Sequence, residues 1–270
     1  METNYELRKE GGYGVMGVII KTFLILFLVL FLAAPLKAYD MSKHKGKGGH
    51  HHGYGRPKGP PSNIPDHIKS RSSKDGTGVN LNNSQVGVAG VRFMAKNEHL
   101  SNIQSMALKT NNLTDEGVNI LGSSPTFQNL EFLSLWDNHI TPTGAKMIAE
   151  SSNFSKLKEL NMSQNYIGDS GVAAIVNSPN SKNLEVLDLS NNKLTDASAI
   201  AIANSPYLRN LKRLDLFKNN IGSKGMKLLL SSKTLDKLEH LDLVSNEIDI
   251  DSAEKLEKNS ALPKLTTLAY

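Results

Sequence analysis

The 270-residue chain contains no cysteine and one tryptophan, and aromatic side chains make up only 6% of it. Without cysteine the chain can form no disulfide, bind no zinc or iron–sulfur cluster through thiolates, and use no thiol as a nucleophile. The one tryptophan is Trp136. Its location matters because tryptophan is enriched among the residues that dominate binding interfaces.

An excess of positive charge is confined to one short segment. Residues 39–75 carry a net charge of +5, whereas residues 1–38 carry +1 and residues 76–270 carry −1. The pI near 9.2 therefore reflects the short segment and not the larger body of the chain. Because nucleic-acid binding requires basic side chains gathered on one face, we expect no nucleic-acid partner.

The first 38 residues have the pattern of an export signal. An uncharged apolar run, Thr22–Ala34, follows a lysine and precedes a short segment that ends at the small residue Ala38. A charged start, an apolar middle and a small final residue are typical of a secretory signal peptide. The pattern predicts a signal over residues 1–38, with an alternative start at Met16, and a secreted or periplasmic product. The other interpretation is an uncleaved membrane anchor over residues 13–36.

Residues 39–75 are rich in glycine, proline, lysine, serine and histidine and contain few apolar side chains. Such a composition cannot offset the conformational entropy lost on folding, so it predicts a disordered linker. Clustered imidazoles at His44 and residues 50–52 could bind a metal ion, but no rigid geometry fixes them, and we expect no metal site. The basic charge could hold the chain loosely against an anionic membrane or envelope surface.

Residues 76–270 contain a unit that recurs every 27 residues without a slip. Seven units follow one another from Gly76, and a partial eighth begins at Leu265. A fixed period of this length indicates a repeat architecture, in which equivalent positions of successive units stack on one another.

Each position within the unit has a physical role. Apolar residues at positions 4 and 6 alternate with polar ones, which predicts a short strand with one buried face. Position 9 is asparagine in six units and Ser84 in the first, and a column of asparagines can satisfy buried backbone groups where the strand ends. A short helix should follow in each unit, with pairs such as Thr114–Asp115 and Asp169–Ser170 as its N-caps.

The pattern L-x-x-L-x-L-x-x-N-x-[IL]-x-x-x-G is similar to that of leucine-rich repeats, and the 27-residue period with one helix per unit resembles the ribonuclease-inhibitor-like subfamily. The resemblance implies the α/β fold class, as a curved solenoid with a parallel sheet on the concave face and helices on the convex face. Strands stack about 4.8 Å apart, whereas helices need about 10 Å, so the array should bend toward the sheet. Ser198 and Ser252 replace the family's glycine, which puts the packing of two helices in doubt.

The resemblance also bears on the source of the chain and on its ends. Secreted relatives from animals and plants usually cap their repeats with disulfides, so the absence of cysteine suggests a bacterial protein. Residues 64–71 are expected to form part of an N-terminal cap. The sequence ends within a strand at Tyr270, and an unpaired strand edge there could allow self-association.

Side chains at positions 3, 5, 7 and 8 should point away from the core, onto the concave face. There Trp136 is expected beside Phe132, with Phe217 three units farther along. The aspartates at position 5 could hold a cation or a basic partner, unless nearby basic side chains neutralise them. The candidate partner-binding residues are Phe132, Trp136, Asp188, Arg213, Asp215, Phe217, Lys218, His240 and Asp242.

The repeats contain no catalytic triad, metal-ligand spacing or phosphate-binding loop, and their histidines fall at different positions of the unit. A thioester ubiquitin-ligase mechanism, which some bacterial proteins with similar repeats use, is excluded by the missing cysteine. We therefore expect no enzyme, no cofactor and no catalytic residues. The sequence predicts an exported module that binds an unidentified protein through its concave face. The alternative is a structural protein of the envelope or membrane, held by the basic linker or by an uncleaved anchor.

Overall fold

The computed structural model describes residues 59–270. The predicted signal peptide, the alternative start at Met16 and the linker histidines at 44 and 50–52 all lie outside the described residues. Within residues 59–270, none of the helices is both long enough and apolar enough to cross a membrane.

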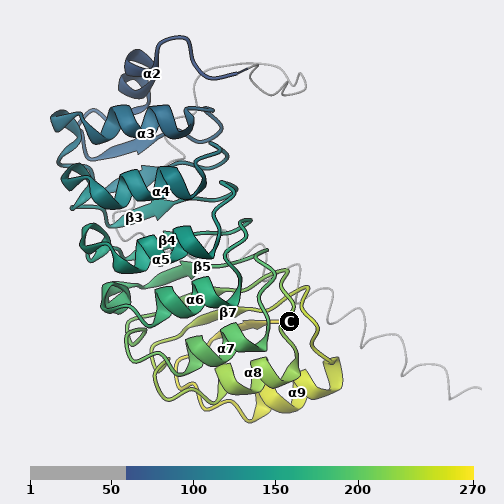
Figure 1. Ribbon diagram of the computed structural model, residues 1–270. Helices are drawn as coiled ribbons and strands as arrows, with labels where there is room; N and C mark the ends of the chain where they lie inside the picture. Colours follow the sequence, from purple (N-terminus) through teal and green to yellow (C-terminus); the bar gives the residue numbers. More distant parts are fainter. Residues whose placement is uncertain (1–58) are drawn as a thin grey trace, which may run out of the picture. The chain divides into compact units, whose positions relative to one another are not determined.

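Each complete unit folds into a short strand, a loop and a helix (Figure 1). The strands are β1 (Gly78–Asn80), β2 (Ser105–Ala107), β3 (Phe132–Ser134), β4 (Glu159–Asn161), β5 (Val186–Asp188), β6 (Arg213–Asp215), β7 (His240–Asp242) and β8 (Thr267–Ala269). The helices are α2 (Ile64–Arg71), α3 (Gly87–Ala95), α4 (Thr114–Ser123), α5 (Pro142–Glu150), α6 (Gly168–Val176), α7 (Asp196–Ala203), α8 (Ser223–Leu230) and α9 (Ile250–Lys258). Short 3₁₀ helices follow α3 to α6, namely η2 (Glu98–Leu100), η3 (Pro125–Phe127), η4 (Ser152–Phe154) and η5 (Pro179–Asn183).

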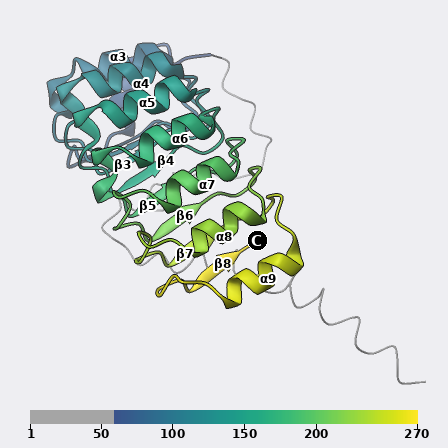
Figure 2. The same cartoon turned by 60° about the horizontal axis from the view of Figure 1, so that its bottom comes forward.

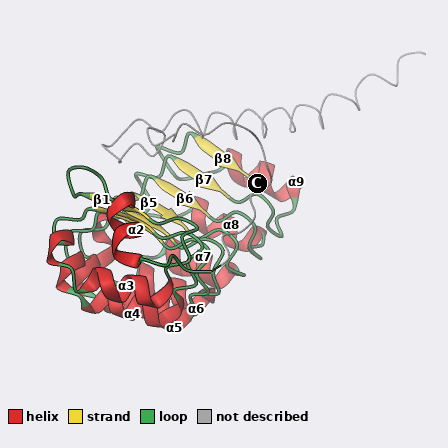
Figure 3. Ribbon diagram, turned by 90° about the horizontal axis from the view of Figure 1, so that it is seen from above, coloured by secondary structure: helices red, strands yellow, loops and turns green. Residues whose placement is uncertain are grey.

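The eight strands form one sheet in chain order. From β1 to β7 the pairing is parallel and joins residues 27 apart, so that Leu133 lies opposite Leu160 and Leu160 opposite Leu187. Helices α3 to α9 follow one another in the same order (Figure 2). Seen from above, the strands lie on one side of the array and the helices on the other (Figure 3). The predicted α/β repeat solenoid with a parallel sheet is confirmed.

The core lies between the sheet and the helices. Leucines at positions 4 and 6, such as Leu187 and Leu189, are fully buried, and helix residues such as Val172 and Ile202 meet them from the other side. These side chains belong to one continuous apolar cluster that runs from the first unit to the last. A single unit could not bury its own leucines, so each unit depends on its neighbours for stability.

A column of asparagines at position 9 joins the units at the ends of the strands. The Asn165 side-chain oxygen accepts hydrogen bonds from the backbone N–H groups of Asn138 and Ile140, each at 3.0 Å. Its amide nitrogen lies 3.0 Å from the carbonyl oxygen of Leu135 and 2.9 Å from that of Met162. The predicted ladder is therefore present, and it satisfies buried backbone groups that no strand or helix reaches.

The residue before each ladder position has a left-handed backbone. Its φ lies between 52° and 61° in all seven units, at Asn83, Thr110, Asp137, Gln164, Asn191, Lys218 and Ser245. Few non-glycine residues adopt this conformation, and the ladder hydrogen bonds on either side offset its cost. These position-8 side chains, together with those at position 10, form a row that we call the loop edge.

Helix α2 lies within residues 39–75, the segment whose composition predicts a disordered linker. The Asn63 side chain accepts a hydrogen bond from the backbone N–H of Asp66 and so caps the helix start. Ile68 is buried and belongs to the apolar core. The helix packs against β1 and α3, as expected of an N-terminal cap, so folded structure begins earlier in the chain than the composition indicates.

The prediction that Thr114–Asp115 and Asp169–Ser170 cap their own helices is wrong. Leu113 precedes α4 and Ile167 precedes α6, and neither makes a side-chain capping bond. Both aspartates lie in the first turn of their helices, where the carboxylates bond to the next unit instead of back along their own chain.

These carboxylates bind the N-cap threonine of the next unit. Asp115 accepts hydrogen bonds from the backbone N–H of Thr141 at 2.9 Å and from its hydroxyl at 2.5 Å. Asp169 binds Thr195 in the same way, at 2.9 and 2.7 Å. Thr141 and Thr195 are the N-cap residues of α5 and α7, and their hydroxyls accept hydrogen bonds from the first turn of those helices. Each aspartate therefore holds the capping residue of the next unit in place. Ser198 also donates its hydroxyl to Asp169, which explains how α7 packs without the glycine.

We predict that Asn165→Ala lowers the free energy of unfolding by about 3 kcal/mol, because it leaves several buried backbone groups without partners. Chemical denaturation followed by circular dichroism measures the change. The matched control is Asn177→Ala, an exposed asparagine at the end of α6 that bonds only within its own helix. Equal effects of the two substitutions would contradict a dominant role for the ladder.

Candidate binding face

Side chains at positions 3, 5 and 7 lie on the side of the sheet opposite the helices, and we call this surface the sheet face. It corresponds to the concave face of the sequence prediction. Six candidate residues lie on the strands themselves, namely Phe132, Asp188, Arg213, Asp215, His240 and Asp242. Trp136 and Phe217 follow two residues after β3 and β6. Lys218 is exposed at the loop edge, where its φ is 54°.

The three position-5 aspartates form a row across neighbouring strands. Asp188 is the register partner of Asp215, which in turn pairs with Asp242. Their backbones are therefore about 4.8 Å apart. Each carboxylate also accepts a hydrogen bond from the backbone N–H two residues later, at 2.9 to 3.0 Å. This turn bond gives the aspartates a structural role at the strand end as well as a shared surface.

The environment of the row favours the protonated forms of its carboxyl groups. Burial raises the pKa of Asp215 to about 7, and the neighbouring Asp188 charge adds to this effect. Burial also raises the pKa values of Asp188 and Asp242. Arg213 acts in the opposite direction on the pKa of Asp215 but does not offset the burial. The expectation that nearby basic side chains neutralise the row is therefore not met at Asp215.

Position 3 adds groups that are themselves poorly solvated. Burial raises the pKa of Glu159, while Arg213 lowers it. Burial and the Arg213 charge lower the pKa of His240. The Nδ1 atom of His240 is buried and has no hydrogen-bond partner among the described residues. Position 3 therefore adds two more titratable groups to the sheet face, each with its charged form disfavoured by burial.

Trp136 is half-buried instead of openly exposed. The Lys109 ammonium lies 3.0 Å from the centroid of its ring, in a cation–π contact between neighbouring units. Phe132, at the start of β3, is half-buried as well, and its place beside Trp136 stays a prediction. Phe217 is the more accessible aromatic on this face, with 38% of its surface exposed.

The loop edge carries exposed side chains that the repeat pattern did not single out. Tyr166 at position 10 is 53% exposed, and its ring stacks on that of His139 with centroids 6.1 Å apart and an interplanar angle of 25°. The Lys193 ammonium lies 5.7 Å from the Tyr166 centroid. The repeat pattern fixes positions 9 and 11 but leaves position 10 free to vary. A variable position between two fixed ones was the only feature of the sequence that could have indicated this edge.

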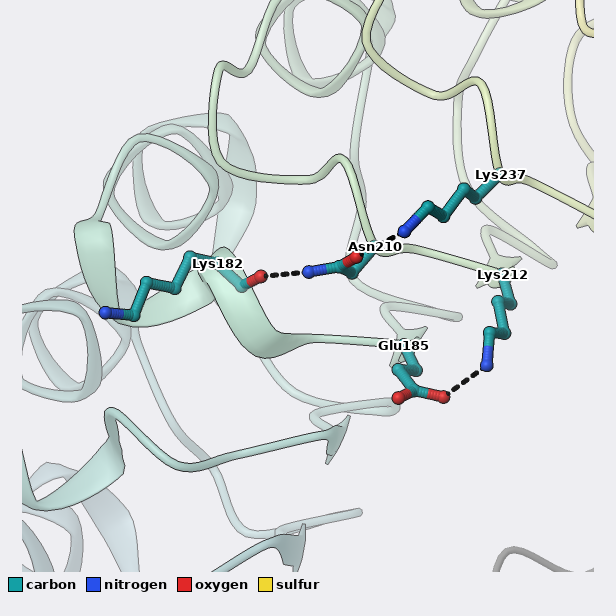
Figure 4. A network of polar contacts seen from close by, with 5 residues as sticks. All are labelled: Lys182, Glu185, Asn210, Lys212 and Lys237. Atoms are coloured by element: carbon teal, nitrogen blue, oxygen red, sulfur yellow. Dashed lines mark hydrogen bonds and ion pairs between the residues drawn. The ribbon is translucent and has the colours of Figure 1, made fainter.

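The opposite edge, before the strands, is occupied by contacts between units (Figure 4). Lys212 forms an ion pair with Glu185 at 2.7 Å. Asn210 donates to the backbone carbonyl of Lys182 at 2.9 Å and accepts from the Lys237 ammonium at 2.8 Å. Two of the lysines drawn there are thus engaged with the neighbouring unit. In residues 59–270, no three histidine, aspartate or glutamate side chains are arranged to hold a metal ion.

We predict that stability falls as pH rises from about 4 to about 7, because the unfolded chain ionises Asp215 at a lower pH than the folded chain does. Asp215→Asn removes the part of this dependence that comes from Asp215. Asparagine already occupies position 5 at Asn161, where its amide donates to Asp188 at 2.6 Å.

At pH 8 the Asp215→Asn variant should be more stable than the wild type by about 2 kcal/mol. This is less than the full pKa shift implies, because the row is partly exposed to solvent. At pH 4 it should match the wild type. Denaturation curves at the two pH values measure this, with Asp236→Asn, an exposed aspartate outside the row, as the control. A gain of the same size at both pH values would argue against a raised pKa.

Comparison with known proteins places repeats along the chain. A family model described as Leucine Rich repeats (2 copies) matches residues 182–224, and one described as Leucine Rich repeat matches residues 128–149 and 155–176. No curated protein matches. Among solved structures, an LRR protein of Leptospira interrogans is similar over 63% of this chain, with 29% sequence identity and a TM-score of 0.40. The match spans 38% of that protein's length.

Proposed function

Because this chain is a leucine-rich repeat protein, we propose that it binds another protein through its sheet face. Leucine-rich repeats are commonly protein-binding modules, and proteins built from them are typically scaffolds and not enzymes. The observation that carries the proposal is the side of the sheet that the helices leave uncovered. It combines an exposed aromatic, Phe217, with a row of half-buried carboxylates.

The chemistry of this face favours a partner with both apolar and basic groups. Phe217 and the half-covered ring of Trp136 supply aromatic anchors of the kind that dominate interface energetics. A cationic group placed against Asp215 would favour the carboxylate and restore its charge at neutral pH. Binding of such a partner should therefore release a proton, and its affinity should rise as pH increases through about 7.

We also propose that the protein is exported to the periplasm or secreted, and that it is a bacterial member of the ribonuclease-inhibitor-like subfamily. The charge and apolar pattern of residues 1–38 and the absence of cysteine support this. The alternative is an envelope- or membrane-associated structural protein, held by the basic residues 39–75 or by residues 13–36 as an uncleaved anchor.

We predict that Trp136→Ala and Phe217→Ala each weaken partner binding about tenfold or more, because each removes a large ring from the sheet face. Affinity capture with the full chain, followed by mass spectrometry, identifies the partner, and titration of the purified partner gives Kd. Ile200→Ala is the control, since Ile200 is an equally exposed apolar side chain on helix α7.

The proposal fails if both sheet-face variants bind the partner as the wild type does, or if Ile200→Ala weakens binding to the same degree. If the protein instead binds anionic vesicles and is released from them in high salt, the membrane-associated alternative is favoured.

We predict that the mature protein begins at Tyr39, because Ala38 ends the export pattern. N-terminal sequencing of the protein recovered from the producing cells tests this. An intact N-terminus in the membrane fraction would instead support an anchor over residues 13–36.

A further inference from the structure

A hollow of about 780 Å³ opens at the loop edge of the first four units. Position 8 supplies one set of lining side chains, position 10 supplies another, and Pro60 adds a wall from the segment ahead of α2. The lining residues are Pro60, Asn83, Gln85, Gly87, Thr110, Asn111, Asn112, Asp137, His139 and Gln164. The volume is within the range of sites that hold small organic ligands.

The lining side chains are mostly amides, with one carboxylate among them. They include the amides of asparagine and glutamine, the Thr110 hydroxyl, the His139 imidazole and the carboxylate of Asp137, which accepts from the Thr110 hydroxyl at 3.1 Å. Amides and hydroxyls offer donors and acceptors at close quarters, as a ligand with many hydroxyl groups requires. Among the described residues, no lysine or arginine lines the hollow, whereas phosphate and nucleic acids are bound chiefly through those cations.

An aromatic surface adjoins the polar lining. His139 lines the hollow, and Tyr166 stacks on it from the next unit while keeping 53% of its surface exposed. A tyrosine ring has an apolar face and a polar hydroxyl. A sugar ring likewise has an apolar face of C–H groups and a rim of hydroxyls, so the two surfaces are complementary.

The backbone of the lining is held by hydrogen bonds between units. Each position-8 N–H donates to a backbone carbonyl of the next unit: Asn83 at 2.8 Å, Thr110 at 2.9 Å, Asp137 at 3.1 Å and Gln164 at 2.8 Å. The asparagine ladder fixes the residue that follows Thr110 and Asp137. The backbone that carries these side chains therefore needs little ordering on binding, which lowers the entropic cost of holding a polar ligand.

We propose that this hollow binds an uncharged oligosaccharide, with Tyr166 stacking on one sugar ring and the position-8 and position-10 side chains bonding the hydroxyls of its neighbours. Equivalent side chains repeat at the strand spacing, so successive units meet successive sugars. The site is separate from the protein-binding function proposed for the sheet face and does not depend on it.

The test is titration of the full chain with cellotetraose, tetra-N-acetylchitotetraose, maltotetraose and mannotetraose, and with a sulfated heparin tetrasaccharide for comparison. At least one neutral tetrasaccharide should bind with Kd of about 1 mM or tighter. Tyr166→Ala should weaken that binding about tenfold, and Asp137→Asn, which keeps the side-chain shape, should weaken it severalfold. Phe217→Ala on the sheet face should leave sugar binding unchanged.

The proposal is overturned if no neutral tetrasaccharide binds, if the heparin fragment binds more tightly than all of them, or if Tyr166→Ala and Asp137→Asn both leave Kd unchanged. Loss of partner capture in Phe217→Ala with sugar binding intact would support two independent sites. If the wild type binds a sugar but captures no protein partner, only the function proposed for the sheet face is contradicted.

Discussion

The buried backbone at the end of each strand needs partners, and the asparagine ladder provides them. Where the chain turns away from the sheet, its N–H and C=O groups lie in the core beyond the reach of strand or helix bonding. Asn138 and Asn165 satisfy these groups in their own unit and in the one before it. The strand register, the left-handed residue at position 8 and the stacking of the units all depend on this set of hydrogen bonds.

Fixed stacking has an electrostatic consequence on the sheet face. Because register pairs Asp188, Asp215 and Asp242, three carboxylates project from adjacent strands whose backbones lie about 4.8 Å apart. Partial burial and like charges then favour the protonated form of Asp215. Each aspartate also supports its own turn, so the same residue contributes to the fold and leaves a surface whose charge depends on pH and on a bound partner.

The two accessible surfaces differ because they come from different positions of the unit. The sheet face consists of alternate strand residues, which project directly from the sheet and include charged and aromatic groups. The loop edge consists of residues on either side of the ladder, where short polar side chains predominate in the first four units. Tyr166 interrupts that polar row with an exposed ring. One repeat pattern therefore presents two chemically distinct surfaces.

The sequence by itself determined the period, the buried columns, the ladder and the composition of the sheet face, because a strict 27-residue spacing states which side chains stack on their own equivalents. Contacts between different positions of neighbouring units were decided only by the tertiary structure. Asp115, at position 13, binds Thr141 at position 12 of the next unit. Asp196, also at position 13, binds the backbone N–H groups of Gly222 and Gly225, at positions 12 and 15 of its next unit. The 27-residue period does not predict these contacts, because they depend on the direction in which each side chain leaves a turn.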